Sequence, residues 1–279
     1  MSRNPSTKPA PLPPDVRLMN GITALLLIGL VLVALALVLH KLVRLPVFAL
    51  QQIEVVGEVN RNGVASLRAN ALPRLSGNFL TLDLAQARAA FESVPWVRRA
   101  TVQRVWPNKL RVRLEEHKVA AYWEPKSEGA DAGSDAVVDR ALVNGFGEVF
   151  HANLGDVEDE KLPVLAGPDG RSRQMLAMWT QLDAQTRAID DAVERLDLSS
   201  RGSWRATLER GAVVELGRGE DAEVQARYAQ FAHNIQRITA HYQSTLASAD
   251  LRHAEGFAVR LRGVTTTAPA PTRGRGRKT

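Results

Sequence analysis

One uninterrupted apolar segment near the N-terminus constrains this chain more than any other feature. Residues 22–39 read ITALLLIGLVLVALALVL, an 18-residue run with no charged side chain. As an α-helix this run would be about 27 Å long, close to the roughly 30 Å of a bilayer core. The run therefore predicts a transmembrane helix at residues 22–43, preceded by a tail at residues 1–21. No second run of this kind follows, so we expect the rest of the chain to fold on one side of the bilayer.

Two questions about this segment stay open at the level of composition. A secretory signal peptide has a shorter apolar core, about 7–15 residues, and a small-residue cleavage site. Ala34 and Ala36 fit such a site, but the apolar run continues past them to Lys41, which favours a retained anchor. Three positive charges precede the run and two follow it closely, so the positive-inside rule favours a cytoplasmic N-terminus only weakly.

Composition narrows the function classes. The chain has no cysteine, which excludes a disulfide scaffold, a thiolate metal site and a cysteine nucleophile. Its net charge of +6 is partly concentrated in residues 265–279, a basic tail rich in Pro, Thr, Gly and Arg that we expect to be disordered. This tail has few Arg-Gly repeats and no stacking aromatics, so we expect no nucleic-acid partner.

Residues 48–118 alternate strand and helix patterns. They predict a strand at residues 53–57, a helix ended or bent by Pro73, a second helix capped by Asp83, and two strands joined by a turn at residues 106–108. Each element has one apolar face to bury. We therefore expect a small α+β unit in which two helices cover one face of a three-stranded sheet.

Residues 119–264 predict a mainly β domain with flanking helices, so the fold class of the whole chain is α+β. The expected elements are, in order, a hairpin at residues 142–150, a helix capped by Ser172, a hairpin at residues 204–216, a helix capped by Asp221, and one final strand at residues 249–262.

Longer phrases in both units resemble one known family. The loop GNFLTLD (residues 77–83) and the phrase VPWVRRATVQRVWPNKLRVRLEE (residues 94–116) resemble the POTRA domain of the FtsQ/DivIB family of bacterial cell-division proteins. The second unit carries further similar phrases in the family's order: LVNGFGEVF, LPVLAGPDG, SRGSWRATLERGAVVELGRGE and ADLRHAEGFAVRL. The resemblance implies a cytoplasmic N-terminus, a single pass through the inner membrane, and two periplasmic domains at the division septum.

The sequence shows no catalytic constellation. The six histidines lack metal-ligand spacing, and the acidic residues at 156–160 are interpreted as a solvated loop. We therefore expect neither an enzyme nor a bound cofactor or metal. The resemblance implies a membrane-anchored scaffold that links early and late division proteins and recruits FtsB and FtsL. Self-association stays open.

The candidate binding surface is the final strand. At a sheet edge, its unpaired N–H and C=O groups would accept a partner strand. By motif, the resemblance implies that two arginines contact acidic residues of FtsB and that neighbouring side chains shape the strand surface. His253 stands where many relatives have Tyr. The expected partner-binding residues are Arg201, Arg252, His253, Gly256, Phe257, Val259 and Leu261.

Other interpretations are kept beside this one. The apolar members of this set would instead pack in the core, and for Phe257 and Val259 the sequence favours core packing and partner contact equally. The arginines would then be solvated residues of the sheet edge. A POTRA-type transport or outer-membrane assembly factor is the alternative function, although the sequence shows no further POTRA repeat. An envelope enzyme ranks third, because the catalytic residues are missing.

Overall fold

The computed structural model describes residues 14–43, 45–57, 60, 61, 63–126, 140–253 and 256–264. The chain forms two compact units, residues 1–116 and 117–279. The boundary therefore falls two residues before the expected one. The expected tail at residues 265–279 and most of the expected N-terminal tail lie outside the described residues.

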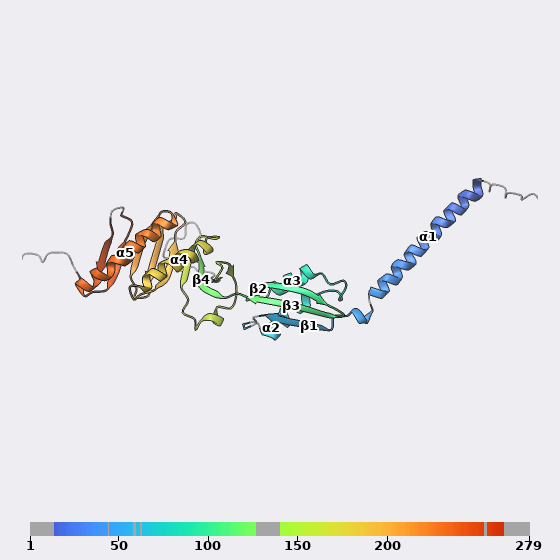
Figure 1. Ribbon diagram of the computed structural model, residues 1–279, viewed down its shortest axis with the longest axis horizontal. Coiled ribbons are helices and arrows are strands. Elements are labelled where there is room, and N and C mark those ends of the chain that lie inside the picture. The colour runs from blue at the N-terminus through green and yellow to red at the C-terminus, as the bar shows by residue number, and fades with distance from the viewer. Residues whose placement is uncertain are drawn as a thin grey trace, which may run out of the picture. The chain divides into compact units, whose positions relative to one another are not determined.

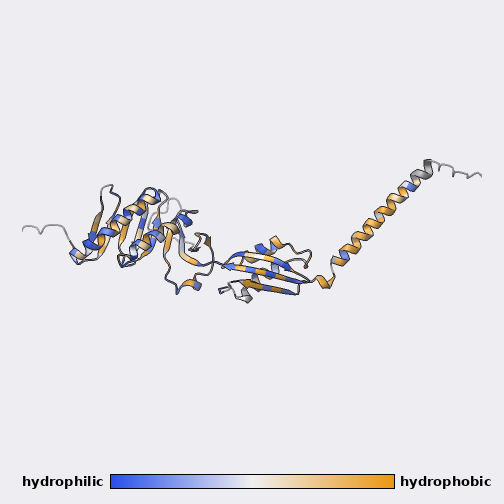
Figure 2. Ribbon diagram, viewed as in Figure 1, coloured by the Kyte–Doolittle hydropathy of each residue, from blue (hydrophilic) through white to orange (hydrophobic). Residues whose placement is uncertain are grey.

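A long apolar helix begins the described chain. Helix α1 (Pro14–Val43) contains a 24-residue segment, Met19–Leu42, with a mean hydropathy of 3.1 and no buried residues. Figure 2 shows this segment as hydrophobic along its length. By length and composition it is able to cross a membrane. The helix starts earlier than expected, so residues 14–21 are helical.

The first domain has the predicted order of elements (Figure 1). In chain order these elements are η1 (Pro46–Phe48), β1 (Gln52–Gly57), α2 (Val64–Ala71), η2 (Leu72–Arg74), α3 (Leu84–Glu92), β2 (Val97–Val105) and β3 (Lys109–Glu116). Pro73 lies in η2, where the α-helix has already ended. The Asp83 carboxylate caps α3 by accepting a hydrogen bond from the N–H of Ala85 at 2.8 Å.

The sheet of the first domain has the strand order β1-β3-β2. Strand β1 pairs parallel with β3, and β2 pairs antiparallel with β3. Side chains from both helices, from β2 and β3 and from the loops on either side of α3 form the core. The members from helices and strands follow the helical and period-2 patterns of the sequence. Its buried members are Leu67, Ala71, Leu82, Ala87, Phe91, Val94, Val97, Ala100, Leu110, Val112 and Leu114.

The second domain contains one mixed sheet and two long helices. Its strands are β4 (Val119–Pro125), β5 (Ala141–Asn144), β6 (Val149–Phe150), β7 (Val164–Gly167), β8 (Val193–Leu198), β9 (Trp204–Leu208), β10 (Val213–Gly217), β11 (Leu246–Asp250) and β12 (Ala258–Leu261). Its helices are η3 (Leu154–Val157), α4 (Ser172–Arg187) and α5 (Asp221–Tyr242). Among the described residues the strand order is β12-β11-β10-β9-β8-β7-β4-β5-β6.

The prediction of one final strand at residues 249–262 is wrong. The structure has two strands, β11 and β12, which pair antiparallel as a hairpin. The apolar residues Ala249, Leu251, Phe257, Val259 and Leu261 all lie at odd positions. The period-2 pattern thus stays in phase across the turn, which made two strands look like one.

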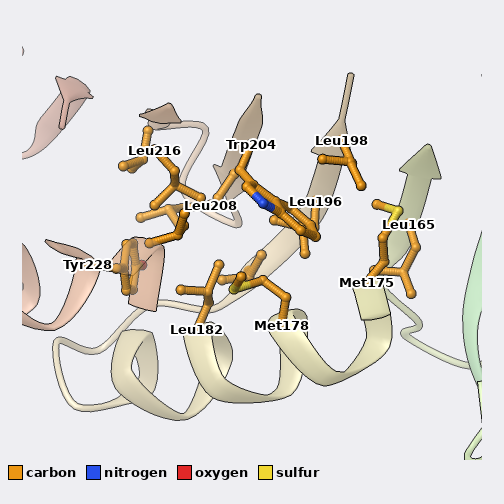
Figure 3. Packing of buried hydrophobic residues seen from close by; sticks show 14 of the residues in the cluster. Leu165, Met175, Met178, Leu182, Leu196, Leu198, Trp204, Leu208, Leu216 and Tyr228 are labelled. Carbon is orange, nitrogen blue, oxygen red and sulfur yellow. The ribbon is translucent and has the colours of Figure 1, made fainter. Parts of the chain in front are cut away.

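Helices α4 and α5 pack against each other and against the sheet (Figure 1). Helix α4 contacts β7 and β8, whereas α5 contacts β10. Figure 3 shows Met178 and Leu182 of α4 directed toward sheet residues such as Trp204. All three side chains are buried, and they belong to the large core that spans β4 to β11.

Two helix caps differ from the sequence prediction. Ser172 is the first residue of α4 and its hydroxyl donates to the carbonyl of Gly147 at 2.7 Å. Asp221 is the first residue of α5, and its carboxylate accepts from Gln174 Nε2 at 2.8 Å. The amphipathic pattern located both helices, but these side chains bond to distant segments instead of to their own helix N–H groups.

Candidate partner-binding site

The candidate site lies at one edge of the large sheet. Strand β12 has one neighbour among the described strands, β11. In that pair Ala258 lies opposite Asp250, and Arg260 lies opposite Ser248. The other side of β12 is therefore the edge at which a further strand would add.

The backbone directions identify the groups that face this edge. The N–H of Arg262 donates inward, to the carbonyl of Thr245 at 2.9 Å. The N–H of Leu251 donates to the carbonyl of Glu215 in β10 at 2.8 Å. The N–H of the preceding residue, Asp250 of β11, therefore points the other way, toward β12. Because N–H directions alternate along a strand, the N–H groups of Val259 and Leu261 point outward to the edge.

The apolar side chains at the edge divide between core and surface. Leu261 is buried, which agrees with the core alternative for this residue. Phe257 and Val259 are partly buried and pack against the core cluster. The ring of Phe257 meets that of Phe231 edge-on, with the centroids 5.5 Å apart. Helix α5 thus supports the edge from beneath.

Arg252 is held by an acidic neighbour in its own turn. Its Nε donates to the Asp250 carboxylate at 2.9 Å, and its backbone N–H donates to the same carboxylate at 3.0 Å. The side-chain hydrogen bond from Arg252 lowers the pKa of Asp250 from 3.8 to about 2, and the pair also raises the pKa of Arg252. The arginine side chain remains 59 % exposed, so it is oriented by Asp250 and still open to a partner.

The topology brings Arg201 to the same end of the sheet as Arg252. Strand β9 begins at Trp204, which pairs with Gly217 at the end of β10. Gly217 in turn lies under the Arg252 side chain, since a Cβ added there would be 2.9 Å from the Arg252 Cγ. Arg201 lies in the turn before β9 and is exposed. Two strand spacings, about 10 Å, separate β9 from β11.

The remaining predicted residues lie in the hairpin turn. His253 and Gly256 are both exposed. No Cβ contact within 4 Å restricts Gly256, so the structure offers no packing reason for a glycine there. The seven predicted residues therefore gather at one end and one edge of the sheet, with Leu261 turned into the core.

Sequence reasoning missed part of the charge at this edge. Arg205 of β9 donates to Glu215 of β10 at 2.7 Å, and Glu215 lies opposite Asp250 in the β10–β11 pair. Arg260 is exposed on β12 itself. The alternation of Val259, Arg260 and Leu261 was the signal for Arg260. No local signal showed the Arg205–Glu215 pair, because it depends on which strands are neighbours.

Within the described residues, no group of three or more His, Cys, Asp or Glu side chains is arranged to hold a metal ion. The acidic segment at residues 156–160 overlaps η3, where the Asp156 carboxylate accepts from Asn153 Nδ2 at 3.2 Å.

These features define a class of protein: one apolar N-terminal helix of membrane-spanning length, a β-α-α-β-β domain, and a mixed β domain with an open edge strand. Comparison with known families agrees with this class. Residues 48–117 match the family model described as POTRA domain, FtsQ-type. Residues 136–252 match the model described as Cell division protein FtsQ/DivIB, C-terminal.

Relatives that match most of the chain are named cell division protein FtsQ. The chain is 37 % identical over 260 residues to the cell division protein FtsQ of Thiomonas arsenitoxydans, covering 93 % of this chain and 92 % of the relative. It is 36 % identical over 257 residues to that of Burkholderia pseudomallei, covering 90 % and 94 %. The chain belongs to the FtsQ/DivIB family of cell division proteins.

Proposed function

We propose that this protein is a non-enzymatic scaffold of the bacterial division machinery that recruits FtsB and FtsL through β12. The observation that supports the proposal most is the edge position of β12, with outward N–H groups at Val259 and Leu261. A partner strand that pairs with these groups gains main-chain hydrogen bonds, and the side chains beside it give selectivity.

The charged residues would set the partner's preference. Arg252 and Arg201 lie at the end of the sheet where the hairpin turn begins. Because Asp250 already orients the Arg252 guanidinium, less side-chain freedom is lost when an acidic partner residue binds. Acidic side chains of FtsB are the proposed contacts, as the family resemblance implies.

The proposed location is the inner membrane at the division septum. Helix α1 would cross the membrane once, with the N-terminus in the cytoplasm and both domains in the periplasm. Its length and hydropathy support the single pass, and the family resemblance supports the orientation. We further propose that the first domain brings the protein to the septum through earlier-arriving division proteins. Membership of a cell-division family favours this role over transport or outer-membrane assembly.

A binding titration tests the recruitment proposal. The full-length chain, held in lipid nanodiscs, is titrated with the extracytoplasmic part of FtsB, alone and together with FtsL. We expect saturable binding that Arg252→Glu weakens at least about tenfold, because a charge-assisted hydrogen bond is worth about 1.5–3 kcal/mol and tenfold in Kd is about 1.4 kcal/mol.

The matched control is Arg237→Glu, which makes the same charge change on the exposed surface of α5. It should leave binding unchanged. Equal weakening by both variants would show only a general effect of charge. If neither FtsB alone nor FtsB together with FtsL binds, the proposal is overturned. Light scattering of the same samples reports whether the chain self-associates.

A further inference from the structure

Three segments of the first domain are joined at one end of its sheet. The N–H of Phe79 donates to the carbonyl of Phe48 at 2.8 Å. The N–H of Gln51 donates to the carbonyl of Asn108 at 3.1 Å, and Asn108 Nδ2 donates back to Gln51 Oε1 at 2.8 Å. The Arg104 guanidinium also donates a hydrogen bond to the carbonyl of Leu82. We call residues 45–51, 77–82 and 104–109 together the interfacial end.

The interfacial end exposes apolar side chains to an unusual degree. Outside α1, nine large apolar side chains of the described residues are exposed, and four of them lie here. They are Trp106 at 79 %, Val47 at 64 %, Leu80 at 46 % and Leu45 at 44 %. Trp96, Trp123 and Trp204 are buried, which makes the exposure of Trp106 exceptional within this chain.

The chain length keeps this end near the membrane anchor. The apolar span ends at Leu42 and β1 begins at Gln52, so residues 43–51 form the whole connection. Nine residues reach at most about 30 Å when fully extended. Tight turns shorten this connection. The N–H of Leu45 donates to the carbonyl of Leu42 at 3.2 Å, and the N–H of Phe48 donates to the carbonyl of Leu45 at 3.0 Å.

Charge at the interfacial end favours an anionic surface. Lys41 and Arg44 follow the apolar run in the sequence, and Arg104 and Lys109 flank Trp106. Asp83, the cap of α3, is the one acidic residue next to these segments. Basic residues close to a bilayer are attracted by anionic lipid headgroups, and Trp prefers the depth of the headgroups because its ring is apolar and its N–H is polar.

We propose that the interfacial end docks the first domain onto the surface of an anionic phospholipid bilayer, with Trp106 and Leu80 inserted at headgroup depth. The occupant is lipid, because the surface continues directly from the membrane-spanning segment. This inference rests on α1 as a membrane anchor and is independent of FtsB and FtsL binding at β12. Docking would hold the domain at a fixed height above the membrane instead of letting it swing on its connection.

Site-directed fluorescence tests the proposal. The chain has no cysteine, so Leu80→Cys gives one labelling site in the full-length protein, and Ala89→Cys on the exposed side of α3 gives a matched control. Both variants carry a polarity-sensitive label in vesicles of phosphatidylethanolamine and phosphatidylglycerol. We expect the label at position 80 to be blue-shifted and quenched several-fold less by aqueous iodide than the label at position 89.

A second substitution separates lipid docking from other causes of shielding. Trp106→Gln in the Leu80→Cys protein should raise iodide quenching toward the control value, whereas Tyr242→Gln, at an exposed aromatic in the second domain, should not. Vesicles of phosphatidylcholine alone should weaken the shielding. Equal quenching at positions 80 and 89 would overturn the proposal. Shielding of position 80 that changes neither with lipid composition nor with Trp106→Gln would also overturn the proposal. It would assign the surface to a contact with protein.

Discussion

At the scale of single residues, the Asp250–Arg252 pair fixes the orientation of one exposed cation at the candidate edge. Arg252 reaches across Gly217, whose φ of +80° and lack of a side chain leave room for the arginine stem. The carboxylate of Asp250 accepts from three donors of Arg252, its backbone N–H, Nε and Nη2. A partner therefore meets an oriented guanidinium whose charge is partly balanced from below.

The low pKa of Asp250 gives a direct test of this pair. The folded pKa of about 2 lies below the ordinary 3.8. The stabilisation is therefore complete above the ordinary pKa and is lost as pH falls toward the folded value. We expect an NMR titration of the Asp250 carboxyl carbon to show a midpoint near 2, and Arg252→Gln to return it toward 3.8. A midpoint that the substitution leaves unchanged would contradict the pairing.

At the scale of elements, the β11–β12 hairpin depends on α5 for its shape. Phe231 of α5 is fully buried and touches Phe257, which leads into β12. The same helix carries Tyr228, whose hydroxyl bonds to Thr186 of α4 at 2.6 Å. Burial raises the pKa of Tyr228 to about 12 against the opposing effect of this hydrogen bond. Helix α5 thus links the candidate edge to the centre of the core.

Removing the Phe231 ring tests this support. We expect Phe231→Ala to lower the free energy of unfolding of the second domain by about 3–5 kcal/mol, because it leaves a cavity beneath Phe257. Denaturant unfolding of the full-length protein measures the loss. The control is Gln236→Ala, an exposed position on the same helix, which should stay within about 0.5 kcal/mol. Similar losses in both variants would contradict the packing role of Phe231, because Ala favours a helix more than either Phe or Gln does.

At the scale of the whole molecule, the two domains have separate cores. No residue belongs to both of the buried clusters within the described chain. The first domain also has a tight internal constraint, since a Cβ at Gly57 would lie 2.2 Å from the carbonyl oxygen of Leu114 and Gly57 has φ of +122°. A substitution at Gly57 should therefore destabilise the first domain alone.

Hydrogen exchange resolves this expectation. We expect Gly57→Ala to destabilise the first domain by at least about 1–3 kcal/mol, since both its backbone angle and its contact are unfavourable. Amides of β3 should exchange faster, and those of β9 and α5 should not change. Gly63→Ala, where no atom lies within 4 Å of the added Cβ, serves as the control. Equal acceleration in both domains would contradict separate folding.

Much of the fold was predictable because its signals are local. The apolar run, the helical spacing of the two long helices, the cap at Asp83 and the turn at residues 106–108 each depend on neighbours within a few positions. The two wrong caps at Ser172 and Asp221 show the limit of local reasoning. Their side chains found partners 25 and 47 residues away, which no spacing rule detects.

Periodicity and turn residues act along the chain, so the sequence alone predicted an apolar helix of membrane-spanning length, a β-α-α-β-β domain and a β domain with two amphipathic helices. The pairing of distant segments, which the sequence did not show, makes β12 an edge among the described strands, brings Arg201 near Arg252 and buries Leu261. Strand neighbours are set by hydrogen bonds between distant segments, and the same alternating strand pattern suits an edge and a centre.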